Sequence, residues 1–182
     1  DPELLRRIGA ATAVEMRAAG MAWTFAPTLA VPQDLRWGRA YEGYAERPGL
    51  VARYAGAIIE GLQGVPGSPA FLDRAHVLAT AKHFLGDGST SNGVDTGDAR
   101  MDEANWRDVA GAGYYAAIAA GVQTVMVSLS SWRGVRMLAN QELLTGILKE
   151  RMHFGGFVLG DRNAQGLVPG CTNEDCPQAY LS

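Results

Sequence analysis

The sequence predicts an α/β fold in which parallel strands are joined by helical crossovers, and it favours a partial (β/α)8 TIM-like barrel of about four strand–helix units. Helical patterns alternate with short apolar runs four times along the 182 residues. The runs are apolar on both faces, as parallel strands covered by helices are. No glycine-rich dinucleotide fingerprint follows any of them, which weakens a Rossmann fold. A full barrel needs about 250 residues, so we expect an incomplete one.

The first predicted unit is a helix followed by a strand. Asp1 is suited to cap a helix that has Pro2 at its first position and Gly20 at its end. A short buried strand is predicted next, over residues 21–26. The apolar face of the helix is expected to comprise Leu4, Leu5, Ile8 and Met16.

The remaining elements repeat this alternation. Further helices are predicted over residues 48–62, 102–120 and 140–152. Further strands are predicted over residues 77–81, 122–128 and 156–160. Glycine-rich or polar loops separate them, chiefly over residues 27–46, 64–69, 86–97 and 130–138. No linker-like stretch divides the chain, so residues 1–182 are expected to form a single domain.

The composition limits the classes of function. The net charge is −3, and the 16 basic and 19 acidic residues are mixed along the chain, so nothing suggests a nucleic-acid partner. Apolar stretches end well short of the roughly 18 residues of a membrane helix, and no signal peptide is visible. Because the chain opens with Asp1 and has no initiator Met, we expect it to have been cut from a longer polypeptide.

The two cysteines, Cys171 and Cys176, stand in the segment CTNEDC with four residues between them, and this segment is rich in loop-forming residues. A small loop closed by a disulfide is the preferred interpretation. Two free thiols are the alternative. A metal site is not expected there, because two further ligands nearby are missing.

Reactive side chains stand after all four predicted strands, at the ends where a (β/α)8 enzyme carries its active site. Arg39 lies in the loop after the first strand, and Lys82 and His83 follow the second. Ser128 ends the third strand and Asp161 directly follows the fourth. Because these strand ends would share one rim, the sequence predicts a site that gathers a carboxylate and several cationic donors.

Each of these residues also has a structural interpretation. Asp161 could cap a helix or begin a turn. Lys82 could form a salt bridge, and His83 could be satisfied in the core. Successive strand residues point to opposite faces, so Lys82 and His83 can face one ligand only where the chain twists at the strand end.

The loop after the first strand leaves similar alternatives. Arg39 could bind a ligand, or it could pin the loop by pairing with Glu42 or Glu46. Trp37 and Trp132 could offer stacking surfaces to a sugar, although a tryptophan is more often part of the core.

Three segments together resemble the signature motifs of family 3 glycoside hydrolases. They are Arg36-Trp37-Gly38-Arg39, Lys82-His83-Phe84-Leu85-Gly86-Asp87-Gly88 and Gly156-Phe157-Val158-Leu159-Gly160-Asp161, in the order and at spacings similar to the family's. The resemblance covers essentially the whole chain and is closest to the β-glucosidase and exo-β-glucanase branch. Gly86-Asp87-Gly88 resembles the glucosidase form rather than that of the β-N-acetylhexosaminidases.

The resemblance implies retaining hydrolysis of terminal non-reducing β-D-glucosyl residues of β-glucosides or β-glucans. Asp161 matches the family's catalytic nucleophile, and Arg39, Lys82 and His83 match residues that hold the non-reducing glucose. No metal or organic cofactor is needed for this chemistry. The expected partners are β-linked glucosides or gluco-oligosaccharides and the remainder of the chain's own polypeptide. The family and the cysteine pair together suggest a periplasmic or secreted protein.

The sequence also departs from the family pattern. Arg162 follows Asp161 where a tryptophan is usual, and Leu129 stands where an aromatic is common. The family's acid/base is a glutamate on a second, C-terminal domain, so none is assigned here. Glu42 and Glu174 are not adopted for that role. The first and last strands of the barrel and this second domain are expected to lie outside residues 1–182.

Two other functions remain open at this stage. A non-catalytic carbohydrate-binding or degenerate domain would account for Leu129, Arg162 and the missing acid. An unrelated barrel, such as an aldolase, could use Lys82 to form a Schiff base. Trapping a fluoroglycosyl adduct on Asp161 would favour the glycosidase, and borohydride trapping of a carbonyl substrate on Lys82 would favour the aldolase.

Overall fold

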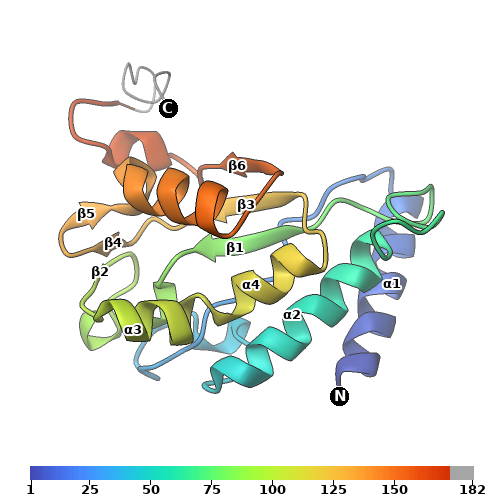
Figure 1. The fold of residues 1–182 in the computed structure, drawn as a ribbon, viewed down its shortest axis with the longest axis horizontal. Helices are drawn as coiled ribbons and strands as arrows, with labels where there is room; N and C mark the ends of the chain where they lie inside the picture. Colours follow the sequence, from blue (N-terminus) through green and yellow to red (C-terminus); the bar gives the residue numbers. More distant parts are fainter. Residues whose placement is uncertain (173–182) are drawn as a thin grey trace.

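A parallel sheet of three strands forms the centre of the computed structural model, which describes residues 1–172. The strands are β1 (Thr80–Phe84), β3 (Thr124–Val127) and β6 (Phe157–Leu159), in the order β1-β3-β6. All pairs are parallel, and the chain returns through a helical crossover each time (Figure 1). The predicted α/β fold class and the partial barrel are therefore confirmed.

Helices cover the outside of this sheet. Figure 1 shows α1, α2 and α4 along one side of the molecule, where α1 packs on α2 and α2 packs on α4. The α-helices are α1 (Pro2–Ala18), α2 (Pro48–Gln63), α3 (Glu103–Asn105) and α4 (Ala112–Ala119). Two π-helices span Trp106–Ala110 and Glu142–Arg151. Short 3₁₀ turns occupy Ala40–Glu42, Asp87–Ser89, Ser91–Gly93, Met137–Ala139 and Ala164–Leu167.

Helix α1 begins as predicted but buries a different face. Asp1 Oδ1 accepts hydrogen bonds from the backbone N–H groups of Glu3 and Leu4, at 3.0 and 3.2 Å. Leu5 and Met16 pack against the core, whereas Leu4 and Ile8 are exposed, so the prediction for these two was wrong. The reason is a close approach to α2, which centres the contact on the buried small residues Gly9 and Ala13.

The predicted buried strand at residues 21–26 is neither a continuous strand nor buried. Its backbone hydrogen-bonds to the chain around β1, as in the 2.8 Å bond from Thr24 N–H to Leu78 O, but only isolated parallel bridges result. Met21, Trp23 and Phe25 are exposed. The segment lies at the edge of the sheet and has a strand neighbour on one side only. The buried part follows it, over residues 29–32.

The predicted helix over residues 102–120 is divided into α3, a π-helical turn and α4. The N–H of Gly111 donates to Trp106 O at 2.9 Å, five residues back, and so absorbs one extra residue. The spacing of apolar residues in the sequence does not indicate this π-helical turn, so a continuous helix was predicted. Trp106 is thereby buried against Phe84 and Trp132, with ring centroids 6.2 and 5.8 Å away.

The loop predicted over residues 130–138 contains part of a small second sheet. β4 (Ser131–Trp132) and β5 (Val135–Arg136) pair antiparallel, and β2 (Asp98–Ala99) pairs parallel with β4. The Oδ1 atom of Asp98 holds the turn between β4 and β5 by accepting hydrogen bonds from Ser131 Oγ and Gly134 N–H, at 2.9 and 2.8 Å.

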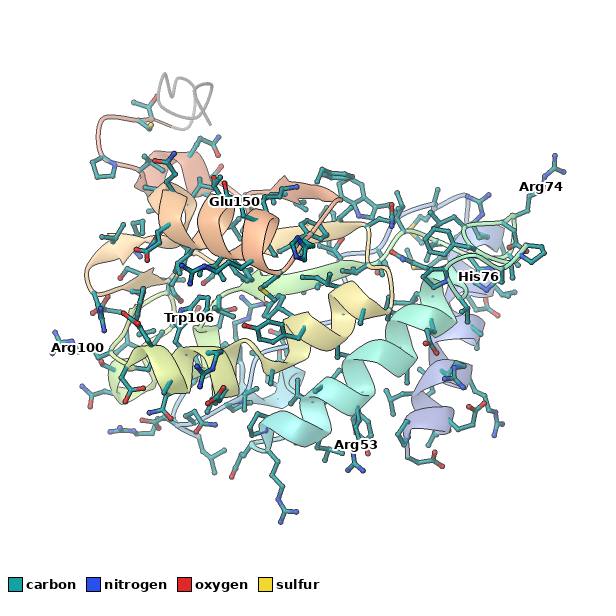
Figure 2. The ribbon with its side chains drawn as sticks, viewed as in Figure 1. Arg53, Arg74, His76, Arg100, Trp106 and Glu150 are labelled. Carbon is teal, nitrogen blue, oxygen red and sulfur yellow. The ribbon has the colours of Figure 1, made fainter. Side chains whose placement is uncertain are left out.

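Many charged side chains lie on the outside of this arrangement. In Figure 2, Arg74 and Arg100 extend away from the body at opposite ends, whereas Trp106 is directed inward. Among residues 1–172, no helix combines the length and the apolar character needed to cross a membrane.

Candidate active site

A shallow hollow lies where the carboxyl ends of the parallel strands meet the loops that follow them. The loop after residues 21–26 contributes Arg39, the end of β1 contributes His83, and the end of β6 contributes Asp161. The rest of the lining is Asp87, Asp95, Thr96, Leu129 and Ser130. Three of the four predicted site residues therefore line one hollow, at the edge of the sheet where the sequence places them.

Asp161 directs one carboxylate oxygen to the backbone and the other toward the hollow. Its Oδ1 accepts a hydrogen bond from Arg162 N–H at 2.6 Å, and its main-chain oxygen accepts from Ala164 N–H at 3.0 Å. Its Oδ2 lies 3.5 Å from His83 Nε2, and 24% of the side chain is exposed. Asp161 thus begins a turn, as the structural interpretation expects, and also places its partly exposed carboxylate beside His83.

His83 is the most buried of the three predicted residues in the hollow, with 4% of its side chain exposed. Its Nε2 lies 3.4 Å from Arg39 Nη2 and 3.5 Å from Asp161 Oδ2, and its Nδ1 lies 2.7 Å from Asp87 Oδ2. The register between β1 and β3 shifts between Ala81 and Phe84. The simple alternation of side chains along a strand therefore does not extend to this strand end.

Arg39 and Lys82 supply positive charge around Glu42. Arg39 Nε and Nη2 donate to the two carboxylate oxygens of Glu42 at 2.7 and 3.0 Å. The pKa of Glu42 is lowered mainly by these hydrogen bonds, and the charges of Arg39, Lys82 and His83 lower it further. The pairing of Arg39 with Glu42 that the sequence left open is present, and it holds the guanidinium at the rim beside His83.

Lys82 is attached to the neighbouring segment through its backbone. Its N–H donates to Pro27 O at 3.0 Å, and its carbonyl accepts from Leu29 N–H at 2.7 Å. The side chain is half-buried, and its ammonium group has no ion pair among residues 1–172, so it remains available as a donor.

The sequence placed Ser128 at a strand end but assigned no role to Asp87 or Ser130. All three side chains are buried, and Asp87 and Ser130 line the hollow. The Ser128 hydroxyl donates to Asp87 Oδ1, and Ser130 Oγ lies 3.4 Å from the same oxygen. The four residues from His83 to Asp87 span the end of β1 and a turn rather than a helix, so their spacing gave no signal of the contact. The two serines follow β3 at the same edge of the sheet.

The two tryptophans beside the motifs belong to the core. Trp37 is 2% exposed and donates from Nε1 to Asp95 Oδ1 at 2.9 Å. Trp132 is 8% exposed and donates to Met101 O at 3.0 Å. Neither side chain offers a free face to a sugar, so the core interpretation is confirmed.

Two sequence hypotheses involve residues that are not described. Glu174 and Cys176 lie outside residues 1–172, so the Cys171–Cys176 disulfide stays a prediction. Within residues 1–172, no group of three histidine, cysteine or acidic side chains is arranged to hold a metal ion.

Known proteins similar to this chain are glycosidases. A β-xylosidase of Formosa agariphila is 40% identical over 91% of the chain, and a periplasmic β-glucosidase of Salmonella typhimurium is 31% identical over 89%. The chain spans 23% and 21% of the length of these two relatives.

Solved structures give the same result. The exo-1,3/1,4-β-glucanase ExoP of a Pseudoalteromonas species superposes on all of the chain with a TM-score of 0.97 and 51% identity, over 23% of its own chain. A variant β-glucosidase of Listeria innocua in complex with laminaribiose superposes on 92% of the chain, with a TM-score of 0.87 and 28% identity, over 23% of its own chain.

The profile of one domain covers nearly the entire sequence. Residues 1–181 match the glycosyl hydrolase family 3 N terminal domain. This match agrees with the strand-end motifs, the parallel sheet and the identity to the glycosidases. The chain belongs to glycosyl hydrolase family 3, as part of its TIM-barrel-like N-terminal domain.

Proposed function

We propose that this chain contributes the nucleophile and the glucose-binding donors of a retaining β-glucosidase or exo-β-glucanase. The observation that carries the proposal is the placement of Asp161, whose side chain is 24% exposed and whose Oδ2 lies 3.5 Å from His83 Nε2 in a hollow that Arg39 also lines. The substrate would be a terminal, non-reducing β-D-glucosyl residue of a β-glucoside or β-glucan.

In the proposed reaction, Asp161 attacks the anomeric carbon. The bond from that carbon to an Asp161 carboxylate oxygen forms as the glycosidic bond breaks, and a second carboxyl group protonates the leaving oxygen. The same second group then removes a proton from water, which attacks the anomeric carbon, releases the sugar and restores the carboxylate. The guanidinium of Arg39, on the rim of the same hollow, complements the negative charge that this attack requires.

Arg39, Lys82 and His83 are proposed to hold the hydroxyl groups of the bound glucose. Arg39 and Lys82 can donate charged hydrogen bonds, which are stronger than neutral ones. The His83 ring can donate or accept one through Nε2, according to its protonation. The hydrogen bonds from Arg39 to Glu42 fix the guanidinium before the substrate arrives. A preset donor loses less conformational entropy on binding than a free side chain does.

The second carboxyl group is proposed to come from the rest of the polypeptide. Glu42 does not suit this role, because its hydrogen bonds to Arg39 lower its pKa and keep it ionised, whereas a general acid must carry a proton. We also propose that residues 1–182 are one incomplete barrel domain whose remaining strands and acid/base domain lie elsewhere in the polypeptide. A periplasmic or secreted location is proposed with it.

Glucosides are favoured over xylosides as substrates. The exo-β-glucanase ExoP is 51% identical to the chain, whereas the β-xylosidase of Formosa agariphila is 40% identical. Comparing kcat/KM for aryl β-glucoside and aryl β-xyloside on the polypeptide that contains this chain tests the choice. A higher value for the xyloside would overturn it.

The role of Asp161 is tested by trapping the covalent intermediate. The polypeptide that contains this chain is incubated with a 2-deoxy-2-fluoro-β-glucosyl donor and digested, and the labelled peptide is identified by mass spectrometry. The adduct is expected on Asp161 and is expected to be absent in Asp161→Asn. Asp98→Asn makes the same chemical change away from the hollow and should label normally. Sugar binding with no adduct would instead support a non-catalytic domain.

A further inference from the structure

Asp87 is a buried carboxylate for which the proposed reaction has no use. Its side chain is 8% exposed, and it lies beside His83 at the base of the hollow. A carboxylate in such a place is costly to bury unless nearby groups satisfy it. Its contacts therefore indicate what it does.

The two oxygens of Asp87 have different neighbours. Oδ1 accepts a hydrogen bond from Ser128 Oγ and has Ser130 Oγ at 3.4 Å. Ser128 Oγ is itself fixed, because it accepts a hydrogen bond from Ser130 N–H at 2.8 Å. With Oδ1 held by the serines after β3, the carboxylate turns Oδ2 toward the end of β1.

Oδ2 faces a single ring nitrogen. It lies 2.7 Å from His83 Nδ1, which is within ion-pair distance. The direction of the ring nitrogen does not give a hydrogen bond to it in this structure. Neither atom has a hydrogen-bond partner within residues 1–172. An ionised carboxylate only accepts hydrogen bonds, so the favourable arrangement places a proton on Nδ1.

We propose that Asp87 is a positioning residue that sets the tautomer of His83. With the proton held on Nδ1, Nε2 is the nitrogen presented to Asp161, to Arg39 and to the sugar, at 3.5 Å from Asp161 Oδ2. This inference rests on the proposed function for its effect on turnover. The tautomer itself does not depend on that function.

The tautomer is read directly from the imidazole ¹⁵N spectrum of the polypeptide that contains this chain. The His83 signals are assigned from a His83→Asn sample. We expect Nδ1 to carry a proton in the unmodified protein, and we expect this preference to be lost in Asp87→Asn. A His83 ring protonated only on Nε2 in the unmodified protein would overturn the proposal, whether or not the variant folds.

The effect on turnover is measured with a double-mutant cycle. Asp87→Asn is expected to lower kcat/KM for an aryl β-glucoside by about 10- to 100-fold, by analogy with the loss seen when a carboxylate that orients a metal-bound histidine is removed. In the His83→Asn background the same change should have little further effect. Fully additive losses would mean that Asp87 acts through the general fold and would contradict the positioning role.

Asp98→Asn is the matched control for this cycle. Asp98 also accepts a hydrogen bond from a serine hydroxyl, that of Ser131 at 2.9 Å, but among residues 1–172 it pairs with an arginine rather than a histidine. The Asp98→Asn substitution should leave both the His83 ¹⁵N spectrum and kcat/KM unchanged. If the unmodified protein forms no adduct on Asp161, the proposed function fails, while the spectrum still decides the tautomer.

Discussion

At the scale of single residues, several side chains in this fold act by joining backbone groups rather than by packing. Gln63, at the end of α2, is fully buried. Its Nε2 donates to Gly121 O at 2.9 Å, and its Oε1 accepts from the N–H groups of Ala79 and Gln123 at 3.0 and 3.2 Å. One amide therefore ties α2 to the chain entering β1 and β3.

Replacing this amide should destabilise the fold. Gln63→Leu removes the acceptor of the buried Ala79 N–H and of the partly buried Gln123 N–H. A buried N–H left without an acceptor costs about 1–3 kcal/mol. We expect a clear fall in the thermal midpoint, measured by scanning fluorimetry. Gln33→Leu is the control, because Gln33 is exposed and its side chain makes only long hydrogen bonds, of 3.2 and 3.4 Å. Equal shifts for the two variants would contradict the explanation.

The pair between Arg39 and Glu42 predicts a pH dependence. Folding lowers the pKa of Glu42 from its usual 4.5, so the unfolded chain takes up the proton first as pH falls. The stabilisation of the fold by the Arg39–Glu42 pair is therefore complete above about pH 4.5, and it is lost as pH falls through the lower pKa that Glu42 has in the folded protein. The difference in thermal midpoint between the unmodified protein and Glu42→Gln should narrow over that acidic range. A difference that stays constant down to about pH 3 would contradict the assignment.

Some of the site could be read from the sequence at this scale, and some could not. Arg39, His83 and Asp161 follow predicted strands, and parallel strands bring their carboxyl ends to one edge, so their meeting was predictable. The contact of Asp87 with His83 depends on the turn between them, which starts with Gly86 in a left-handed conformation. No periodic pattern encodes that turn, so the partner of His83 had to be seen in the structure.

At the scale of elements, the packing of α1 on α2 depends on two glycines. A Cβ atom on Gly61 would lie 2.2 Å from Arg6 O, and one on Gly9 would lie 2.7 Å from Ile58 O. The helices therefore touch along their backbones. An apolar pattern gives the residues of a helix face but not the distance to its neighbour, which explains why Leu4 and Ile8 were assigned to the wrong surface.

This contact can be tested within a single helix. Gly61→Ala should force α1 and α2 apart, at a cost of about 1–3 kcal/mol or more. Gly49→Ala, in the first turn of α2, adds the same methyl group where nothing lies within 4 Å and should be neutral or slightly stabilising. Thermal midpoints of the two variants decide the point. A stable Gly61→Ala variant would show that the helices are not in such close contact.

At the scale of the whole molecule, the described residues have one side that helices cover and one side on which apolar side chains are exposed. Helices cover the outer face of the sheet, whereas apolar side chains remain exposed along residues 21–25 and at Phe157 on β6. Trp23, Phe25 and Phe157 gather there, with the ring centroid of Trp23 5.0 Å from that of Phe25 and 5.6 Å from that of Phe157. The overall architecture was predictable because strand order follows chain order. The exposure of these apolar side chains was not predictable, because the sequence does not show which apolar residues lack a covering segment.

The isolated 182-residue chain is expected to be weakly stable and to show little or no hydrolysis. Parallel strands with uncovered edges tend to pair with other chains, and only one carboxylate of the required two is assigned. Turnover of a chromogenic β-glucoside by the purified chain measures this directly, with the longer polypeptide as the positive control. Normal turnover by the short chain would show that it is complete for catalysis.

The exposed indole of Trp23 allows the apolar side around residues 21–25 to be followed by tryptophan fluorescence. Trp23 is 37% exposed, whereas the other three tryptophans, Trp37, Trp106 and Trp132, are 2%, 6% and 8% exposed. Quenching by a small water-soluble agent such as acrylamide therefore samples Trp23 far more than the others. A drop in quenching, together with a shift of emission to shorter wavelength, would report the moment at which another segment closes over residues 21–25, without any dye or engineered label.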